Sequence, residues 1–539
     1  MREVSMQDGF GEYGFESESG GLSIARRLSV SAAAASLFFG SASAMARDRA
    51  PIVRVEQGFL EGTRTGDGLD RFLGVPYAAA PVGERRFRPP QPVPSWRGLR
   101  DATTLPPRCL QLGGGGGGAE DCLYLNVFVP THTRRAGRLP VIVNLHGGSF
   151  KVGAAIDNDP TRLAASTDTI VVMLNYRLGQ FGFLAHAALG DESADGSSGN
   201  YGFMDQQAAL RWVQTNIGAF GGDPTDVTIQ GLSAGGWSVC GHLVAEGSRG
   251  LFSRAVIHSA SCWARPLADA EADGNAFAAS LGCTDEANAA ACLRAKPSAE
   301  LLAADSWSQP SSLVYGGGTL PVAPAQSVLA GNFRKVPIII GGTRNEIRGG
   351  LAADYPVDAA KYATLVNEIF GPLASDILAA YPVEQFADPF DAYAEVLNDS
   401  SIGGLGTCLT LGLADSFAAH TATYVYEFDD PNAPVPTFYS LPPGMQLGSS
   451  HGSDEGYWFD RPFDTLTPLE PLQRLLAHQM NQYLGAFAER GEPVVWRQPR
   501  FPRYTASNPA VMRFRPGALG VRNDLGEQHH CALWRSLGF

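Results

Sequence analysis

A serine in the stretch TIQGLSAGGWS, residues 228–238, has the surroundings of a catalytic nucleophile. The pattern G-x-S-x-G around Ser233 is weak by itself in a chain with 63 glycines, and residues 448–452 match it too. The two matches differ in context, because residues 226–230 predict a buried strand before Ser233 and the residues after it can continue as a helix. Strand, sharp turn and helix lift a serine hydroxyl clear of a sheet. We therefore interpret Ser233 as a nucleophile and the second match as a loop.

A serine hydroxyl needs a general base, and that base needs an acid that orients it. His451 lies in a polar loop downstream of a predicted strand, which is where a mobile base is expected. The other histidines that we considered have different expected roles. His146 lies at a strand end, His242 and His258 are expected to be packing residues, and His529 and His530 are expected to be solvated near the C-terminus.

The candidate acid follows another predicted strand. Residues 336–340 are apolar and lead into a polar turn that contains Glu346. A carboxylate just past the carboxyl end of a parallel strand lies at the edge where α/β sheets carry their chemistry. Asp454 is a rival, but it is so close to His451 in sequence that orienting the ring would be awkward. The order Ser233, Glu346, His451 is that of the α/β-hydrolases.

A tetrahedral oxyanion also needs backbone N–H donors. Gly147 and Gly148 end a predicted strand, and Ala234 directly follows the candidate nucleophile. We expect these three amides to form the oxyanion hole. Taken singly, each candidate residue also fits an ordinary turn or surface loop, so the interpretation depends on the set.

The elements that must position these residues alternate between strand and helix. Leu210, Val213 and Ile217 have the spacing of a buried helix stripe. Continuous apolar runs are typical of parallel strands covered on both faces, and they occur at residues 141–145, 170–174, 227–229, 255–257, 336–340 and 423–428. This predicts an α/β fold with a large, mostly parallel central sheet flanked by helices, and one domain over residues 47–539.

Composition and targeting signals narrow the function further. The net charge is 41 − 54 = −13, which argues against a general nucleic-acid binder. Arg26 and Arg27 precede an apolar run at residues 28–40 and small residues at 42–46, so residues 1–46 are predicted to be a leader with a secretory signal. We expect a periplasmic or secreted protein. Because no other segment approaches 18 uninterrupted apolar residues, we expect no membrane span.

Export makes disulfides plausible for the eight cysteines. Two pairs flank short loops and a third would tie the C-terminus to a distant segment: Cys109 with Cys122, Cys283 with Cys292, and Cys408 with Cys531. Cys240 and Cys262 remain as expected buried thiols. The sequence alone does not fix this connectivity.

From about Ile52 to Trp534 the chain resembles the type-B carboxylesterases and lipases, which include the cholinesterases. The motifs that carry the resemblance include EDCLYLNVFVP at 120–130, HGGSF at 146–150 and GNYGFMDQQAALRWVQTNIGAFGGDP at 199–224. The resemblance implies the same triad, oxyanion hole and three cysteine pairs, and it adds Ser259 as a residue that supports the triad. It departs at Leu232, where the family usually has Glu. It also departs in the short loop between Cys109 and Cys122, which has six consecutive glycines and no aromatic residue.

These observations predict a serine carboxylic-ester hydrolase that acts on a small-molecule ester and needs no metal or cofactor. A lipase for long acyl chains and a non-catalytic, cholinesterase-like adhesion protein are the alternatives. The oligomeric state is open.

Charged residues near the predicted site raise a question about the substrate. Lys151, one of four lysines, follows the oxyanion loop, while Arg265 and Arg348 lie near the acyl-pocket segment and the triad acid. With Leu232 in place of an acid, these residues would make the mouth of the site positive. A positive mouth suits esters that bear carboxylates, such as the tricarballylate esters of fumonisin-type toxins that some secreted bacterial family members hydrolyse. In the alternative, the cations pair with local acids and the enzyme is a broad short-chain esterase.

Overall fold

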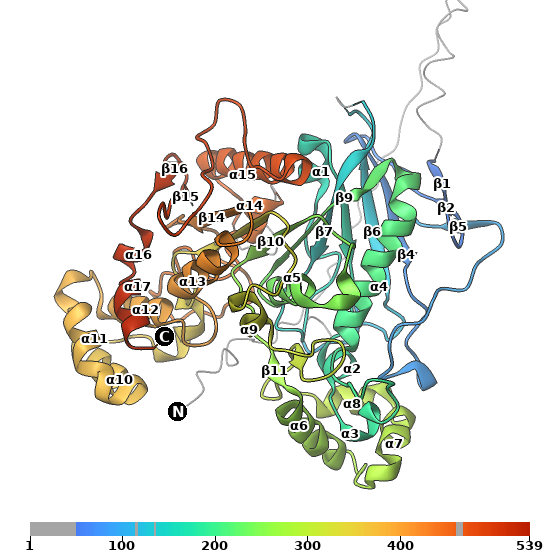
Figure 1. Ribbon diagram of the computed structural model, residues 1–539, viewed down its shortest axis with the longest axis horizontal. Coiled ribbons are helices and arrows are strands. Elements are labelled where there is room, and N and C mark those ends of the chain that lie inside the picture. The colour runs from blue at the N-terminus through green and yellow to red at the C-terminus, as the bar shows by residue number, and fades with distance from the viewer. Residues whose placement is uncertain (1–49, 114–116, 134–135, 460–466, 539) are drawn as a thin grey trace, which may run out of the picture.

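The computed structural model describes residues 50–113, 117–133, 136–459 and 467–538. Eleven strands of these residues form one sheet, in the spatial order β16-β15-β14-β13-β10-β9-β7-β8-β6-β4-β3 (Figure 1). Their bounds are β3 Thr63–Arg64, β4 Leu69–Pro76, β6 Tyr124–Pro130, β7 Leu139–Leu145, β8 Ile170–Leu174, β9 Gly222–Leu232, β10 Arg254–His258, β13 Ile338–Thr343, β14 Thr423–Phe428, β15 Val511–Phe514 and β16 Gly520–Arg522.

The middle of this sheet is parallel. β7 pairs in parallel with β8 and with β9, and parallel pairing continues through β10, β13, β14 and β15. Antiparallel strands lie at the two ends, where β6, β4 and β3 follow β8, and β16 follows β15. All five residues of β8 are buried, as expected for a parallel strand covered on both faces. The predicted fold class is confirmed.

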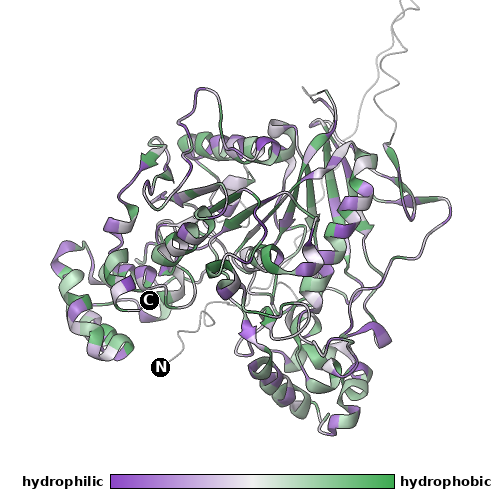
Figure 2. Cartoon of the chain, viewed as in Figure 1, coloured by the Kyte–Doolittle hydropathy of each residue, from purple (hydrophilic) through white to green (hydrophobic). Residues whose placement is uncertain are grey.

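Helices cover both faces of the sheet, and the strand residues alternate between them. Val141 and Val143 of β7 pack in the same cluster as helices α4, α5 and α13, whereas Ile142 packs in the cluster of α1 and α15. Figure 2 shows the central strands mostly in the hydrophobic colour and the helices in mixed colours. The bounds are α1 Thr161–Thr167, α4 Tyr201–Asn216, α5 Ala234–Val244, α13 Thr407–Ala418 and α15 Pro471–Arg490.

Two groups of helices extend beyond the sheet, and each has its own apolar cluster (Figure 1). One contains α2 Gly179–Phe183, α3 Ala187–Gly190, α6 Leu267–Ser280, α7 Ala289–Ala295 and α8 Ser298–Ala304. The other contains α10 Ala359–Phe370, α11 Ala374–Ala380, α12 Pro389–Ser400 and α17 Cys531–Ser536. Helix α16 Leu525–Gln528 precedes α17, and its Leu525 packs in the cluster of α4, α5 and α13. The remaining elements are α9 Pro324–Leu329, α14 Glu455–Trp458, the small sheet of β1 Ile52–Val55, β2 Gly58–Glu61 and β5 Leu99–Asp101, and the pair β11 Arg265–Pro266 and β12 Val314–Tyr315.

The sequence predicts that the chain has no membrane-spanning segment and that it begins with a secretory leader. None of the helices in the described ranges is both long and apolar enough to span a bilayer. The leader predicted at residues 1–46 lies outside the described residues.

The structure joins the cysteines in four disulfides. Three of them are the pairs proposed above, which the family resemblance also implies: Cys109–Cys122, Cys283–Cys292 and Cys408–Cys531. The expectation of two buried thiols is wrong, because Cys240 and Cys262 form the fourth disulfide, with 5.3 Å between their Cα atoms. Both are buried, as expected. Helix α5 packs against β10, and this contact brings Cys240 close to Cys262 in the segment after the strand.

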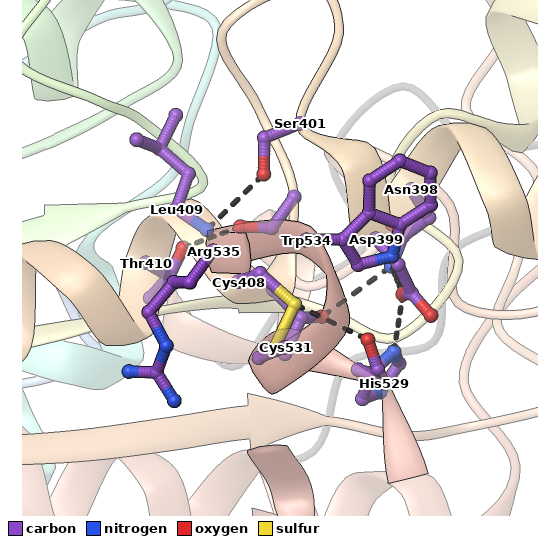
Figure 3. Close-up of a disulfide and its surroundings, with 12 residues drawn as sticks. Asn398, Asp399, Ser401, Cys408, Leu409, Thr410, His529, Cys531, Trp534 and Arg535 are labelled. Carbon is purple, nitrogen blue, oxygen red and sulfur yellow. Dashed lines mark hydrogen bonds and ion pairs between the residues drawn. A yellow bond between two sulfur atoms is a disulfide. The ribbon is translucent and has the colours of Figure 1, made fainter. Parts of the chain in front are cut away.

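His529 is a second correction, since it is fully buried instead of solvated. Its Nδ1 lies 2.5 Å from Asp399 Oδ1, and its carbonyl oxygen lies 3.2 Å from Cys408 Sγ (Figure 3). Burial lowers the pKa of His529, but the facing carboxylates, above all Asp399, outweigh it and raise the pKa to about 10. The disulfide between Cys408 and Cys531 fixes the chain two residues later, so this histidine is held inside. His530 is exposed, as predicted.

Candidate active site

Ser233 lies at a sharp turn between β9 and α5. Its backbone has φ 56° and ψ −122°, a conformation that non-glycine residues rarely adopt. Its N–H donates to the carbonyl of His258, 3.0 Å away, which ties the turn to β10. A Cβ added at Gly235 would lie 2.0 Å from the carbonyl oxygen of Leu145, so only glycine allows this approach. The predicted strand–turn–helix around Ser233 is therefore present, at the carboxyl edge of the parallel strands.

His451 and Glu346 meet across two loops at the same edge. His451 follows β14, Glu346 follows β13, and His451 Nδ1 lies 2.7 Å from Glu346 Oε1. With Nδ1–H donated to the carboxylate, the lone pair of the ring is on Nε2. Burial lowers the pKa of His451, but the nearby carboxylates, above all Glu346, together outweigh it, so the pKa lies above its ordinary value.

The second oxygen of Glu346 is held as firmly as the first. Oε2 accepts hydrogen bonds from the Thr343 N–H at 2.9 Å, from the Thr343 hydroxyl, and from Ser259 Oγ at 3.3 Å. Burial would raise the pKa of Glu346, but His451 and Thr343 outweigh it and the pKa is lowered. The carboxylate is thus ionised and fixed. Ser259 lies where the family resemblance implies it.

Three positioning contacts were missed from the sequence. Thr343 lies three residues before Glu346, and a turn of this length is a local signal that could have revealed it. Asn398 accepts the backbone N–H of Glu346 at 3.1 Å, and Tyr439 donates to the carbonyl of His451 at 3.2 Å. No local pattern predicts the last two contacts, because Asn398 is 52 residues from Glu346 and Tyr439 is 12 residues from His451.

The rival acid, Asp454, has other partners. Its Oδ2 accepts hydrogen bonds from Tyr426 and from the indole of Trp458, each at 3.0 Å. Burial raises the pKa of Asp454 to about 6. His258 Nδ1 lies 2.9 Å from the Tyr426 hydroxyl in the same buried network, which agrees with its predicted packing role.

The loop after β7 passes directly against the nucleophile. A Cβ added at Gly147 would lie 2.8 Å from the carbonyl oxygen of Leu232 and 3.4 Å from Ser233 Cβ, and Gly148 has φ +99°. Among the described residues, the N–H groups of Gly147, Gly148 and Ala234 donate no hydrogen bond. The three N–H groups that the sequence predicts for an oxyanion hole therefore have no protein acceptor in this part of the chain.

His146, at the end of the same strand, serves the loop structurally. Its ring stacks on Tyr176, with 4.2 Å between the centroids, and burial lowers the pKa of His146 to about 4. The ring is therefore neutral at ordinary pH, and the prediction that it is not the base agrees with this position.

Among the described residues, one group of side chains is spaced closely enough to hold a metal ion, namely Glu395, Asp399 and His529. Arg344 already lies 3.3 Å from Glu395 and 3.5 Å from Glu427. Because this arginine and the protonated histidine compensate the carboxylates, we interpret the group as an ion-pair network.

Comparisons with known proteins decide the family. The profile described as the carboxylesterase family matches residues 49–534. The chain belongs to the carboxylesterase family. It is 33% identical over 474 residues to an acylcarnitine hydrolase of Rattus norvegicus, covering 81% of this chain and 82% of that one. It is 34% identical over 467 residues to a cocaine esterase of Oryctolagus cuniculus, covering 80% and 85%. A solved thermophilic PNB esterase superposes with a TM-score of 0.74 at 29% identity, covering 89% of this chain and 99% of that one.

The family and its relatives establish that this esterase hydrolyses carboxylic esters. The structure does not have the free positive charges that the sequence predicts at the mouth of the site. Lys151 lies 2.5 Å from Asp305 and is 2% exposed. The two arginines are paired as well, Arg265 with Asp273 at 2.6 Å and Arg348 with Asp391 at 2.5 Å.

The structure therefore has the alternative arrangement, in which the three cations of the esterase pair with local acids. The expectation of free cations at the mouth is corrected on this ground. Lys151 in particular is too buried to contact a substrate. Leu232 is half-buried, and its Cδ2 would lie 3.9 Å from a Cβ added at Gly452, next to His451.

Proposed function

We propose that the esterase acts through an acyl-enzyme on Ser233, with His451 as general base and Glu346 as the acid that orients it. The observation that carries this proposal is the 2.7 Å contact between His451 Nδ1 and Glu346 Oε1, on loops at the edge where the strained Ser233 turn lies. A second support is the set of unpaired amides at Gly147, Gly148 and Ala234.

The proposed reaction has two halves. His451 Nε2 takes the proton of Ser233 as its Oγ attacks the ester carbonyl carbon, and the amides bind the resulting oxyanion. The C–O bond to the alcohol then breaks, and His451 returns the proton to the leaving alcohol. In the second half, a water gives its proton to His451 and attacks the acyl carbon, which releases the acid and restores Ser233. Glu346 stabilises the imidazolium in both halves.

Small to medium, largely apolar esters are the substrate class that the site supports best. Trp237 lies one helical turn after Ser233, its ring is 5.4 Å from that of Trp263, and Trp263 is 39% exposed. Such an aromatic wall suits an apolar acyl or alcohol group. The names of two relatives, acylcarnitine hydrolase and cocaine esterase, are those of enzymes that act on small-molecule esters.

Polycarboxylate esters, such as tricarballylate esters of fumonisin-type toxins, are a second candidate. The observation that favours them is Leu232, which leaves no carboxylate directly before the nucleophile. The paired state of Lys151, Arg265 and Arg348 argues against them. A lipase for long acyl chains is the third candidate, and a series of esters of increasing chain length separates it from the first.

The direct test is labelling with a fluorophosphonate, which traps a nucleophilic serine. We expect one equivalent to abolish hydrolysis of 4-nitrophenyl butyrate, with the adduct on the peptide that contains Ser233. Heat-unfolded protein, which keeps the serine but loses the site, is the control and should not react. An adduct on another residue, with full loss of activity, would reject the assignment.

Replacing Leu232 by Glu tests the substrate charge. We expect kcat/KM for 4-nitrophenyl hemisuccinate to fall about 30-fold more than for 4-nitrophenyl butyrate, because two negative charges about 8 Å apart repel by about 2 kcal/mol at an effective dielectric constant of 20. Leu232→Gln, which has the same size without the charge, is the matched control. Added salt should reduce the difference. Equal losses for the two esters would place residue 232 outside the reach of the substrate.

The compartment is also a proposal. We infer that the protein matures in an oxidising compartment, because four disulfides join all eight cysteines. This supports export, which the residues at 26–46 predict, without distinguishing periplasm from medium.

A further inference from the structure

The oxyanion loop holds an unusual backbone conformation. Ser149 and Phe150 are consecutive non-glycine residues with φ 54° and φ 56°. Side chains disfavour this left-handed region, and such residues persist only where the surroundings determine them. They directly follow Gly147 and Gly148, whose amides are two of the three proposed oxyanion donors. The direction of those donors therefore depends on what holds residues 149 and 150 in place.

Lys151, the next residue, ends in a buried ion pair. Its Nζ lies 2.5 Å from Asp305 Oδ1, and the two side chains are 3% and 2% exposed. The backbone N–H of Lys151 also donates to the carbonyl of Gly148 at 2.9 Å, which closes the turn of the loop. One residue thus joins the loop to a distant carboxylate through its side chain and to the oxyanion glycines through its backbone.

Asp305 connects this pair to a second element. It follows helix α8, and its Oδ2 accepts the N–H of Gln180, at the start of α2, at 3.2 Å. The N–H of Gly179 donates in turn to the carbonyl of Phe150 at 2.7 Å. The loop, α2 and α8 therefore meet around a single carboxylate, with Phe150 held on one side by α2 and on the other by Lys151.

The far end of the loop has its own tie. Gln111, from the short disulfide loop, accepts the N–H of Gly153 at 3.0 Å and donates to its carbonyl at 3.1 Å. The segment between this tie and β7 is consequently anchored at both ends. Between them, the Phe150 ring packs against Phe183 of α2 and Trp237 of α5. Lys151 adds the one ion pair that the described residues form in this segment, to Asp305 after α8.

Stability alone does not explain a buried lysine at this position. Removing two charges from water is costly, and apolar residues of similar size often serve stability equally well. A substrate contact does not explain it either, because Lys151 is 2% exposed. What the pair does provide is a fixed direction for the backbone around it.

We propose that Lys151 is a positioning residue, whose buried pair with Asp305 holds the oxyanion loop in the left-handed conformation that aims the Gly147 and Gly148 amides at the reacting carbonyl. This inference rests on the proposed function. Donors of an oxyanion hole act mainly in the transition state, so their misplacement lowers kcat more than it raises KM.

The first experiment is Lys151→Met, which keeps an unbranched side chain of similar length without the charge. We expect kcat to fall about 10- to 100-fold with KM within about twofold, since one lost oxyanion donor costs at least about 100-fold and a displaced loop weakens donors partially. The affinity for an alkyl boronic acid, which mimics the tetrahedral oxyanion, should fall by the same factor as kcat/KM. Neutral and anionic esters should be affected equally.

A double variant separates positioning from stability. Lys151→Met leaves Asp305 as a buried, unpaired charge, so it should lower Tm, and Lys151→Met/Asp305→Asn removes that charge and should recover most of the loss. We expect kcat of the double variant to stay at least about tenfold below wild type, because the link between loop and helices is still absent. Arg294→Met, which breaks the ion pair between a buried arginine on α7 and the exposed Glu192, is the control and should lower Tm with kcat unchanged.

Three outcomes overturn the proposal. One is an unchanged kcat in folded Lys151→Met, and another is recovery of both Tm and kcat in the double variant, which carries the test if the single variant does not fold. The third is a loss confined to KM for anionic esters, which would make Lys151 a substrate contact. Ser233→Ala in the same assay keeps the proposals distinguishable, because activity in that variant rejects the catalytic serine whatever Lys151 does.

Discussion

Ser233→Ala is expected to lower kcat for ester hydrolysis by about 10⁶, and His451→Ala by a similar factor, with little further loss in the double variant. The losses do not add because base and nucleophile act as one unit, so removing either leaves only binding and the oxyanion hole. Initial rates with 4-nitrophenyl butyrate measure the effect. Thermal unfolding of each variant checks that the fold is retained.

The second G-x-S-x-G match provides the serine that would be the nucleophile if Ser233 is not. Ser450 occupies the serine position of that match and is fully buried in the loop before His451. If Ser233→Ala keeps substantial activity while Ser450→Ala loses it, the nucleophile has been misassigned. The left-handed turn at Ser233, which has no counterpart at Ser450, is the reason to expect the opposite.

Much of the fold was predictable because parallel strands leave a strong local signal. Residues 170–174 and 423–428 are continuous apolar runs, and the structure places β8 and β14 at those bounds. A central strand that is covered on both faces needs apolar side chains at almost every position, so it can be recognised in the sequence without knowing which strands lie beside it. The same signal narrows the candidate site, because Glu346 and His451 lie in the polar segments that follow two such strands, β13 and β14.

Pairing over long distances was not predictable from such patterns. Lys151 meets a carboxylate 154 residues away, and no feature of the local sequence identifies Asp305 as its partner. A charged residue near a site therefore looked like a substrate contact, when burial makes it part of the scaffold. His529 was misplaced for the same reason, because Asp399 and a disulfide draw it into the interior.

Glu346→Gln is expected to lower kcat by about 10⁴, because an amide facing His451 Nδ1 favours the wrong tautomer of the ring. The pH profile should change as well. The base must be neutral, so activity falls as the pH drops through the pKa of His451, which Glu346 raises above its ordinary value of about 6.5. Without the carboxylate, the acidic limb of kcat/KM should move to lower pH even as its plateau falls.

Asp454→Asn is the matched control for this experiment, since it neutralises another acid near His451, the one after Glu346 in its effect on the pKa of the ring. Asp454 also raises the pKa of His451, though less than Glu346, so a small shift of the limb in the same direction is expected, with kcat within about tenfold of wild type. The hydrogen bonds from Tyr426 and Trp458 hold Asp454 away from the role of orienting acid. A 10⁴-fold loss in Asp454→Asn together with a nearly active Glu346→Gln would reverse the two assignments, and the 2.7 Å contact between His451 and Glu346 would then be structural.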